Sequence, residues 1–247
     1  MILRGTAEQL RRQDWAAVAI ELVLVVAGVF LGIQVANWND DRKDRDAEKA
    51  YLARIAGDAR ADVAALDEII RVAEVRKALL NEMLPKASGR PLPTGFTSAR
   101  GRVPIETVPP YDPSANSSPG FALFILTPLD ENRSGYQTLI ATGAIAGMED
   151  GEALKRIQDY YAAVDREKHF EIALEQNRDK FVDAQRKAGI SPVRPMSVEQ
   201  ITAALARDPE MLATAQNYWL YTNRHLKLAR DLQKQAKALA GWLEGRS

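Results

Sequence analysis

The histidines and the carboxylates near them are the residues of this chain with the most potential for chemistry. The sequence has two histidines, His169 and His225. His169 has Asp165 one helical turn before it and Glu171 close behind, a set that could hold a metal ion. The neighbours of His225 are aromatic or basic: Tyr218, Trp219, Tyr221 and Arg224. Because a metal site needs three or four converging ligands, we interpret both histidines as ordinary helix-surface residues.

Other signs of catalysis are weak in this sequence. It contains no cysteine, which excludes disulfides, thiolate nucleophiles and sulfur-ligated zinc. It also contains no nucleotide-binding, metalloprotease or serine-hydrolase motif. A zero net charge gives no reason to expect a nucleic-acid partner. We therefore predict no catalytic residue, no cofactor and no metal. Four further acids lie close together in the sequence, near Arg60 and Arg71, and we expect all of them on a solvated helix face: Asp58, Asp62, Asp67 and Glu68.

An apolar segment near the N-terminus is the clearest structural signal. Residues 15–38 (WAAVAIELVLVVAGVFLGIQVANW) contain one charge, Glu21. A helix of this length spans about 36 Å, enough for a hydrocarbon core of about 30 Å. Trp15 and Trp38 stand at its ends, where indole rings serve as interfacial anchors. The pattern predicts a transmembrane helix. The alternative is a cleaved signal peptide, for which the run is long and the candidate cleavage site at 34–36 (QVA) unfavourable.

Small residues and the charge share one face of this segment. The face comprises Ala17, Glu21, Val25, Gly28, Gly32 and Ala36. Gly28 and Gly32 have the spacing that lets two helix backbones approach in lipid, and an ionisable group inside the membrane usually faces a partner. We predict that this face packs against another membrane helix. The alternative is that the glycines are incidental and that Glu21 reaches towards the membrane surface.

The rest of the chain predicts an all-α fold. After an N-terminal tail (1–14) and the span (15–38), residues 39–84 read as a long juxtamembrane helix continuous with the span, ended by Pro85. Apolar residues recur every seven positions from Leu52 to Leu80. Residues 85–131 read as a proline-rich loop without regular structure, followed by an apolar strand or extended strap at 121–126. Residues 132–247 should form helices that pack on 45–84 as a bundle.

Within that last region, the sequence predicts three helices after the first helical stretch at 132–147. One starts near Asp150 and reaches about Ala188, and a short one opens with a capping box at Ser197 and Gln200. The last runs from about Asp208 to Gly245, with Trp219 in the core and its aromatic neighbours in the core or at its rim.

Two stretches resemble a family of uncharacterised bacterial single-pass membrane proteins. The first is 28–39 (GVFLGIQVANWN) followed by a charged run and 48–52 (EKAYL). The second is 136–145 (YQTLIATGAI) with Leu154, Tyr160 and Tyr161 downstream. The resemblance implies a protein of the bacterial cytoplasmic membrane, and the family carries no activity to transfer.

These features favour a non-catalytic, membrane-anchored interaction protein. Its partners would be the lipid bilayer and another membrane helix, in a homo-oligomer or as an accessory subunit of a larger complex. The alternatives are a ligand-sensing helical bundle and an unrecognised enzyme. Three basic residues precede the span and five follow it closely, which favours a cytoplasmic C-terminus. The short N-terminal tail before a long polar domain is typical of a signal anchor, and on that ground we expect the domain in the periplasm.

Overall fold

The structure of this protein is a computed structural model that describes residues 15–98, 101–114, 118–148, 150–191 and 194–246, with the backbone alone for 15–18 and 98. The chain divides into two compact units, Met1–Ala50 and Tyr51–Ser247. The elements are α2 (Trp15–Ser88), β1 (Gly95–Ser98), β2 (Gly101–Pro104), α3 (Pro119–Phe124), α4 (Ser134–Ala141), η1 (Ala144–Gly147), α5 (Gly151–Lys187), α6 (Val198–Arg207) and α7 (Pro209–Glu244). The all-α prediction is confirmed. The predicted N-terminal tail, 1–14, lies outside the described residues.

Helix α2 begins in the first unit and continues into the second. Its helical backbone runs from the apolar segment into the first bundle helix without interruption, as the sequence predicted. The predicted end at Leu84 is wrong, because α2 passes through Pro85 and ends at Ser88. Proline has a helical φ, so it can be part of the last turn, although the hydrogen bond that its amide would donate is lost. The Ser88 hydroxyl donates to the Leu84 carbonyl at 2.7 Å and closes the end of the helix.

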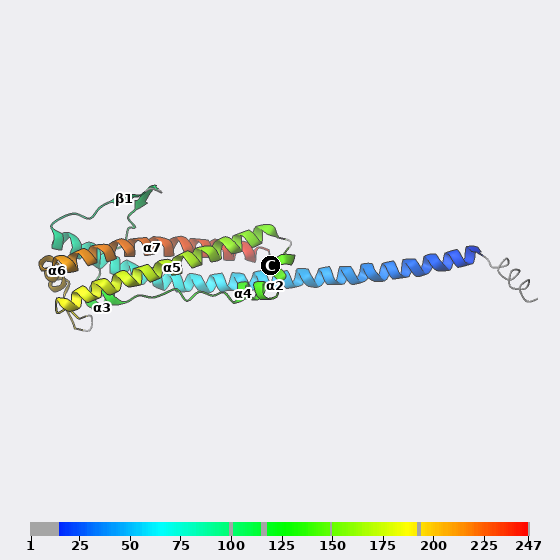
Figure 1. Ribbon diagram of the computed structural model, residues 1–247, viewed down its shortest axis with the longest axis horizontal. Coiled ribbons are helices and arrows are strands. Elements are labelled where there is room, and N and C mark those ends of the chain that lie inside the picture. Colours follow the sequence, from blue (N-terminus) through cyan, green and yellow to red (C-terminus); the bar gives the residue numbers. More distant parts are fainter. Residues whose placement is uncertain (1–14, 99–100, 115–117, 149, 192–193, 247) are drawn as a thin grey trace, which may run out of the picture. The chain divides into compact units, whose positions relative to one another are not determined.

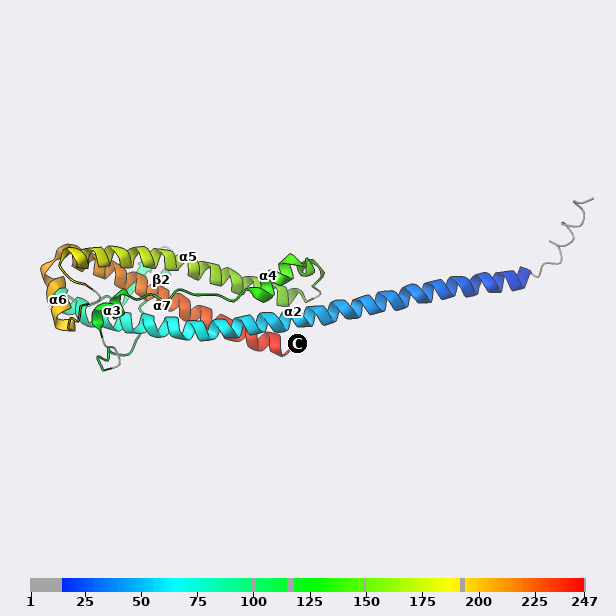
Figure 2. The ribbon, with the colours of Figure 1, turned by 90° about the horizontal axis from the view of Figure 1, so that it is seen from below.

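The second unit is built on three long helices: the C-terminal part of α2, α5 and α7 (Figures 1 and 2). Contacts along their length fix their directions. Asp62 of α2 meets Tyr160 near the start of α5, and Leu80 of α2 shares an apolar cluster with Phe181 near the end of α5, so these two helices run parallel. Asn81 of α2 meets Trp219 near the start of α7, whereas Arg60 pairs with Glu244 at its end, so α7 runs antiparallel to α2.

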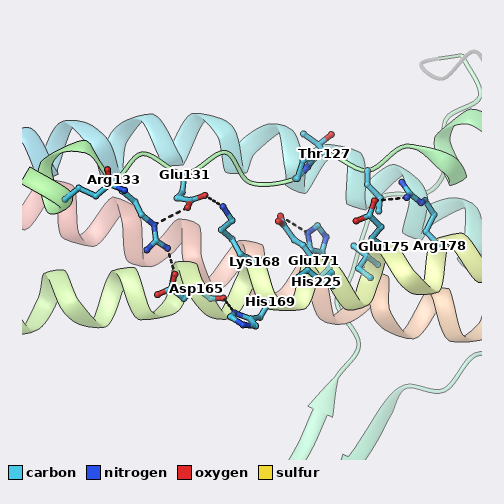
Figure 3. Close-up of a pocket in the computed structure, with 15 residues that line it drawn as sticks. Thr127, Glu131, Arg133, Asp165, Lys168, His169, Glu171, Glu175, Arg178 and His225 are labelled. Atoms are coloured by element: carbon cyan, nitrogen blue, oxygen red, sulfur yellow. Dashed lines mark hydrogen bonds and ion pairs between the residues drawn. The ribbon is translucent and has the colours of Figure 1, made fainter.

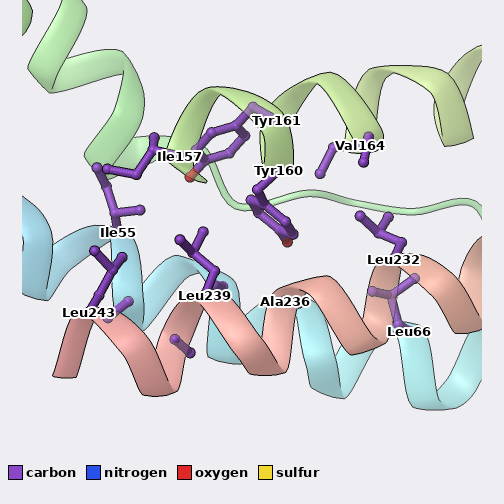
Figure 4. Packing of buried hydrophobic residues seen from close by; sticks show 14 of the residues in the cluster. Ile55, Leu66, Ile157, Tyr160, Tyr161, Val164, Leu232, Ala236, Leu239 and Leu243 are labelled. Atoms are coloured by element: carbon purple, nitrogen blue, oxygen red, sulfur yellow. The ribbon is translucent and has the colours of Figure 1, made fainter. Parts of the chain in front are cut away.

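The predicted apolar stripes form the core of this bundle. In α2, the residues at seven-residue intervals from Leu52 to Leu80 are all buried. One cluster packs α2 against the first half of α5 and the second half of α7, around Leu66, Val164 and Leu239 (Figure 4). A second cluster joins the other ends of these helices around Leu80, Phe181 and Tyr218. Two separate apolar clusters thus hold the two ends of the bundle.

The long connection between α2 and α5 follows from their parallel directions. A chain that leaves one end of α2 must return along the bundle before a parallel helix can start, and α5 with 37 residues spans about 55 Å. The return begins with the antiparallel β1–β2 hairpin, in a region predicted to lack regular structure. It continues through α3 to an extended segment, residues 125–133, that lies along α2 and α5 (Figure 2). This segment is here called the strap.

The apolar run at 121–126 is not the strand or strap that we predicted. Residues Pro119–Phe124 form the short helix α3, and the strap begins one residue later. Two local signals open α3: Ser118 accepts a hydrogen bond from the Phe121 amide at 3.3 Å, and Pro119 occupies the first helical position. Leu123 is buried, whereas Phe121 is half exposed, because a helical turn places these residues on different faces.

Asp58 and Asp62 are buried, so the prediction of a solvated face is wrong for both. The carboxylate of Asp58 accepts the Gly135 amide at 2.7 Å and the Ser134 hydroxyl at 3.0 Å, which holds the start of α4. The carboxylate of Asp62 accepts the Asn132 amide at 2.8 Å and the Tyr160 hydroxyl at 2.6 Å. The two acids therefore fasten the strap and α4 to α2. Asp67 and Glu68 are exposed, as expected.

The helix starts in the rest of the bundle follow the sequence closely. Asp150 caps α5 through the amides of residues 152 and 153, and the predicted capping box of Ser197 and Gln200 opens α6. Asp208 caps α7, which ends at Glu244, one residue before the predicted limit. The region predicted as one helix over 132–147 consists of α4 and η1, which are separated at Gly143 by a left-handed φ of 72°.

Candidate functional site

A layer of polar side chains separates the two apolar clusters at mid-bundle. α2 contributes Arg76, α5 contributes Glu167 and Glu171, and α7 contributes Thr222 and His225. Arg76 donates from Nε to the Thr222 hydroxyl at 3.3 Å and from Nη1 to the Ile125 carbonyl of the strap at 3.0 Å. The guanidinium is therefore satisfied by neutral oxygens. The acids and the histidine of this layer, Glu167, Glu171 and His225, form the candidate site, here called the Glu–Glu–His cluster.

The Glu–Glu–His cluster is compact and short of hydrogen bonds. His225 Nε2 lies 3.3 Å from Glu167 Oε1 and 3.9 Å from Glu171 Oε1. Side-chain exposure is 1% for Glu167, 3% for His225 and 14% for Glu171. Among the described residues, neither carboxylate oxygen of Glu167 and neither ring nitrogen of His225 has a hydrogen-bond partner. Buried polar atoms are rarely left in this state, so the cluster requires an explanation.

Burial shifts the pKa values of the cluster towards the neutral forms. Loss of water raises the pKa of the Glu167 carboxyl to about 8, with a further rise from the charge of Glu171 and an opposing effect from Arg224. Burial also lowers the pKa of His225. The nearby charge of Arg76 lowers this pKa further, whereas the contact with Glu171 raises it. At neutral pH, the protein atoms alone therefore favour a protonated Glu167 beside a neutral imidazole.

A groove connects the cluster to the surface. It has a volume of about 670 Å³, lies between the strap and α5, and reaches Glu171 and His225 (Figure 3). Its walls carry ion pairs: Glu131 of the strap meets Arg133 and Lys168. Figure 3 shows Glu171 and His225 facing each other at the inner wall. Small ions and water therefore have a path to the buried cluster.

The prediction of two surface histidines is half wrong. His169 is exposed, and its Nδ1 lies 3.0 Å from the Asp165 carbonyl one turn earlier in the same helix. His225 is buried, because it occupies a core position of α7. The grouping of His169 with Asp165 and Glu171 does not form either. Asp165 pairs with Arg133, whereas Glu171 turns inward to His225.

Sequence reasoning missed Glu167, although its spacing places it in the core. It stands in a seven-residue row of α5 whose other members are buried and apolar or aromatic: Tyr160, Leu174 and Phe181. His225 stands in the corresponding row of α7, with Tyr218, Leu232 and Leu239. An ionisable residue at a core position of each of two helices was the signal that could have identified the site.

The residues predicted to pack in the membrane lie on α2 in the first unit. Glu21, Val25, Gly28, Gly32 and Ala36 are exposed, and they fall within an arc of about 80° around the helix. A Cβ atom added to Gly28 or Gly32 would meet no atom within 4 Å. Trp38 is 61% exposed. The side chains of Trp15 and Ala17 lie outside the described residues. The packing role of this face stays a prediction.

The apolar segment of α2 is long and apolar enough to cross a membrane, and none of it is buried within the chain. Twelve large apolar side chains between Ile20 and Trp38 are 53–66% exposed. A core helix of a soluble domain would hide such residues, so this surface is available to lipid or to another protein.

Comparison with known proteins identifies one relationship. Residues 21–87 match the model of a family of unknown function, DUF6090. This confirms that the N-terminal part of the chain resembles an uncharacterised family, and the match covers residues 21–38 of the apolar segment and the rest of α2 up to residue 87. The stretch at 136–161 lies beyond the matched residues. No curated protein and no solved structure matches the chain.

Proposed function

We propose that this protein is a non-catalytic, membrane-anchored helical module that binds another membrane protein through its span. The partner is a second copy of the chain or a larger membrane complex in which it serves as an accessory subunit. The observation that carries the proposal is the uncovered apolar surface of α2 between Ile20 and Trp38. The bundle, by contrast, buries its own apolar stripes in two clusters and needs no partner to complete its core.

The face of Glu21, Gly28 and Gly32 supports a helix as the partner. Association between helices in lipid depends on close van der Waals packing and on hydrogen bonds across the contact, since lipid tails are as apolar as leucine. Open space beside both glycines allows a second backbone to approach. The Glu21 carboxyl on the same face would then find a partner away from lipid.

The proposed location is the bacterial cytoplasmic membrane, with the span as an uncleaved signal anchor and the bundle in the periplasm. The absence of cysteine suits a compartment in which stray thiols mispair. The long polar domain after the span is of the kind that is translocated largely regardless of charge, whereas the basic residues that follow the span favour the reverse orientation.

The test replaces Gly28 and Gly32 together by leucine. Two isobutyl groups would force the helix axes apart, and lipid offers no hydrophobic gain in return. We expect co-purification of differently tagged copies, or of a membrane partner identified with the parent chain, to be lost, while membrane insertion is retained. Glu21→Gln should weaken association less, because a hydrogen bond between membrane helices is worth only about 1 kcal/mol.

Leucine at Phe30 or Gln34, on the opposite face, provides the matched control and should leave association unchanged. Association of the double glycine variant at the parent level would refute the packing face and leave α2 as a tether. Recovery of the parent chain without its first 36 residues would refute the anchor itself.

A ligand-sensing bundle is the second candidate, and the groove that leads to the Glu–Glu–His cluster favours it. Binding would then occur within the second unit, independently of the span. An unrecognised enzyme is the third reading from the sequence, and the same groove is where its substrate would have to bind.

A further inference from the structure

We propose that Glu167, Glu171 and His225 bind a divalent transition-metal ion through two carboxylates and one imidazole. The three side chains offer one ligand atom each within 4.8 Å of one another. Metal–ligand bonds of about 2.0–2.2 Å place neighbouring ligand atoms about 3.0–3.5 Å apart. The separations of 3.3 Å and 3.9 Å from His225 Nε2 need only small side-chain movements to reach that geometry.

The unsatisfied atoms of the cluster are the strongest argument for a cation. Glu167 and His225 are nearly fully buried, and they lack hydrogen bonds among the described residues. An unpaired ionised carboxylate in the interior is strongly destabilising, whereas a bound cation would satisfy Glu167 and His225 Nε2 together. A proton on Glu167 would also neutralise the buried carboxylate and is the alternative to a bound cation. A metal ion that binds Glu167 must displace this proton, so proton release accompanies metal uptake.

The surroundings of the cluster suit an ion with room for further ligands. The Leu129 amide of the strap donates to Glu171 Oε1 at 2.8 Å, which orients this carboxylate as an outer-shell partner would. The groove reaches Glu171 and His225, so water can enter and complete the coordination. Two nearby cations oppose binding: Arg76 acts on His225 and Arg224 on Glu167. The two ionised carboxylates offset the charges of these two guanidiniums, and the neutral imidazole adds none, so the affinity has to come from direct coordination of the ion by the three side chains.

The ligand types select the class of ion. One imidazole with two carboxylates suits Mn²⁺, Fe²⁺ or Zn²⁺, whereas Ca²⁺ and Mg²⁺ prefer oxygen ligands alone and Cu⁺ prefers sulfur. The general order of affinities predicts tighter binding of Zn²⁺ than of Mn²⁺. The three ligands belong to the second unit, so metal binding and association through the span are tested independently of each other.

The experiment titrates the full-length chain in mild detergent, stripped with a chelator, with Zn²⁺ and separately with Mn²⁺. We expect one Zn²⁺ per chain, weaker Mn²⁺ binding, and release of about one proton per ion at pH 7 as Glu167 ionises. Glu167→Gln and His225→Asn should each lower the Zn²⁺ affinity at least tenfold. Glu167→Gln keeps the shape of the side chain and removes a buried acid, so circular dichroism should show an intact bundle.

Two variants provide matched controls: His169→Gln, at the exposed histidine, and Glu175→Gln, at an exposed acid that lines the same groove. Both should bind Zn²⁺ with the parent affinity. The proposal is overturned if the parent chain binds no stoichiometric ion, or if Glu167→Gln binds Zn²⁺ with the parent affinity. It is equally overturned if the control variants lose as much affinity as the cluster variants, since binding would then be spread over the surface.

Discussion

Replacing Glu167 by glutamine should stabilise the metal-free bundle, and the gain should increase with pH. Burial holds the Glu167 pKa at about 8, above the ordinary value of 4.5. Between these values the unfolded chain loses its proton while the folded chain keeps it, so the folded state loses stability as pH rises. The slope is about 1.4 kcal/mol per pH unit, and it ends near pH 8, where the folded carboxyl also ionises. The whole interval corresponds to about 5 kcal/mol as an upper limit.

Glutamine has nearly the same shape as a protonated glutamic acid and does not titrate. Glu167→Gln should therefore exceed the parent by less than about 1 kcal/mol at pH 5, and by increasingly more up to pH 8. The charged groups that face this position, Glu171, Arg224 and Arg76, remain in both proteins. His225 also remains in both proteins. Because its pKa is lowered in the folded state, the unfolded chain takes up a proton first below pH 6.5, and the parent and the variant lose stability there equally.

The assay is denaturant unfolding of the full chain in mild detergent with excess chelator, at several pH values between 5 and 8. The quantity compared is the difference in unfolding free energy between the variant and the parent at each pH. A constant difference across this range would refute the reasoning, since Glu167 would then ionise in the folded protein as it does in the unfolded chain. A lower stability of Glu167→Gln at pH 8 would refute it as well.

Two further positions test the packing of α4 on α2 and the burial of Lys77, a residue of α2 whose ammonium group donates to the Asn223 side-chain carbonyl at 2.8 Å. Gly135→Ala would place its Cβ 2.9 Å from the backbone nitrogen of Ile55, so the unfolding free energy should fall by about 1–3 kcal/mol. The control Gly147→Ala, in open space, should change it little. An unchanged melting temperature for Gly135→Ala would contradict this packing. Burial lowers the pKa of Lys77 to about 8 from 10.5, so the folded chain releases its proton first and stability should rise between pH 8 and 10.5. Lys77→Met should abolish this rise, and a parent chain whose unfolding free energy stays flat over that interval would refute the shift.

The long helices could be predicted from the sequence because their apolar spacing is regular. Leu52, Leu66 and Leu80 recur at the same position of α2, and all three are buried. The capping box at Ser197 and the start of α7 at Asp208 are local signals, which need no knowledge of the tertiary structure. These features depend on residues that are close together in the chain.

The parallel directions of α2 and α5 could not be predicted in the same way. They depend on the path of the connection between them, and the strap is held by distant contacts such as that of Asp62 with the Asn132 amide. Such contacts explain why two acids expected on the surface are buried. Asp62 nevertheless follows Ile55 by seven residues and precedes Ile69 by seven, so its core position was present in the spacing. Its charge masked that signal.

The polar layer at mid-bundle also determines the register of the three helices. Rows of leucine and alanine repeat every seven residues, so apolar contacts alone would tolerate a shift of one helix by one heptad. A shift of α7 by seven residues would place Ala215 or Ala229, instead of Thr222, beside Arg76. Arg76 Nε would then lose its acceptor while Nη1 keeps the Ile125 carbonyl, and a buried donor without a partner costs about 1–3 kcal/mol, a large part of the stability of a domain. The charges inside this bundle therefore act against misaligned packing, and the chain folds in one alignment where its apolar repeat alone would permit several.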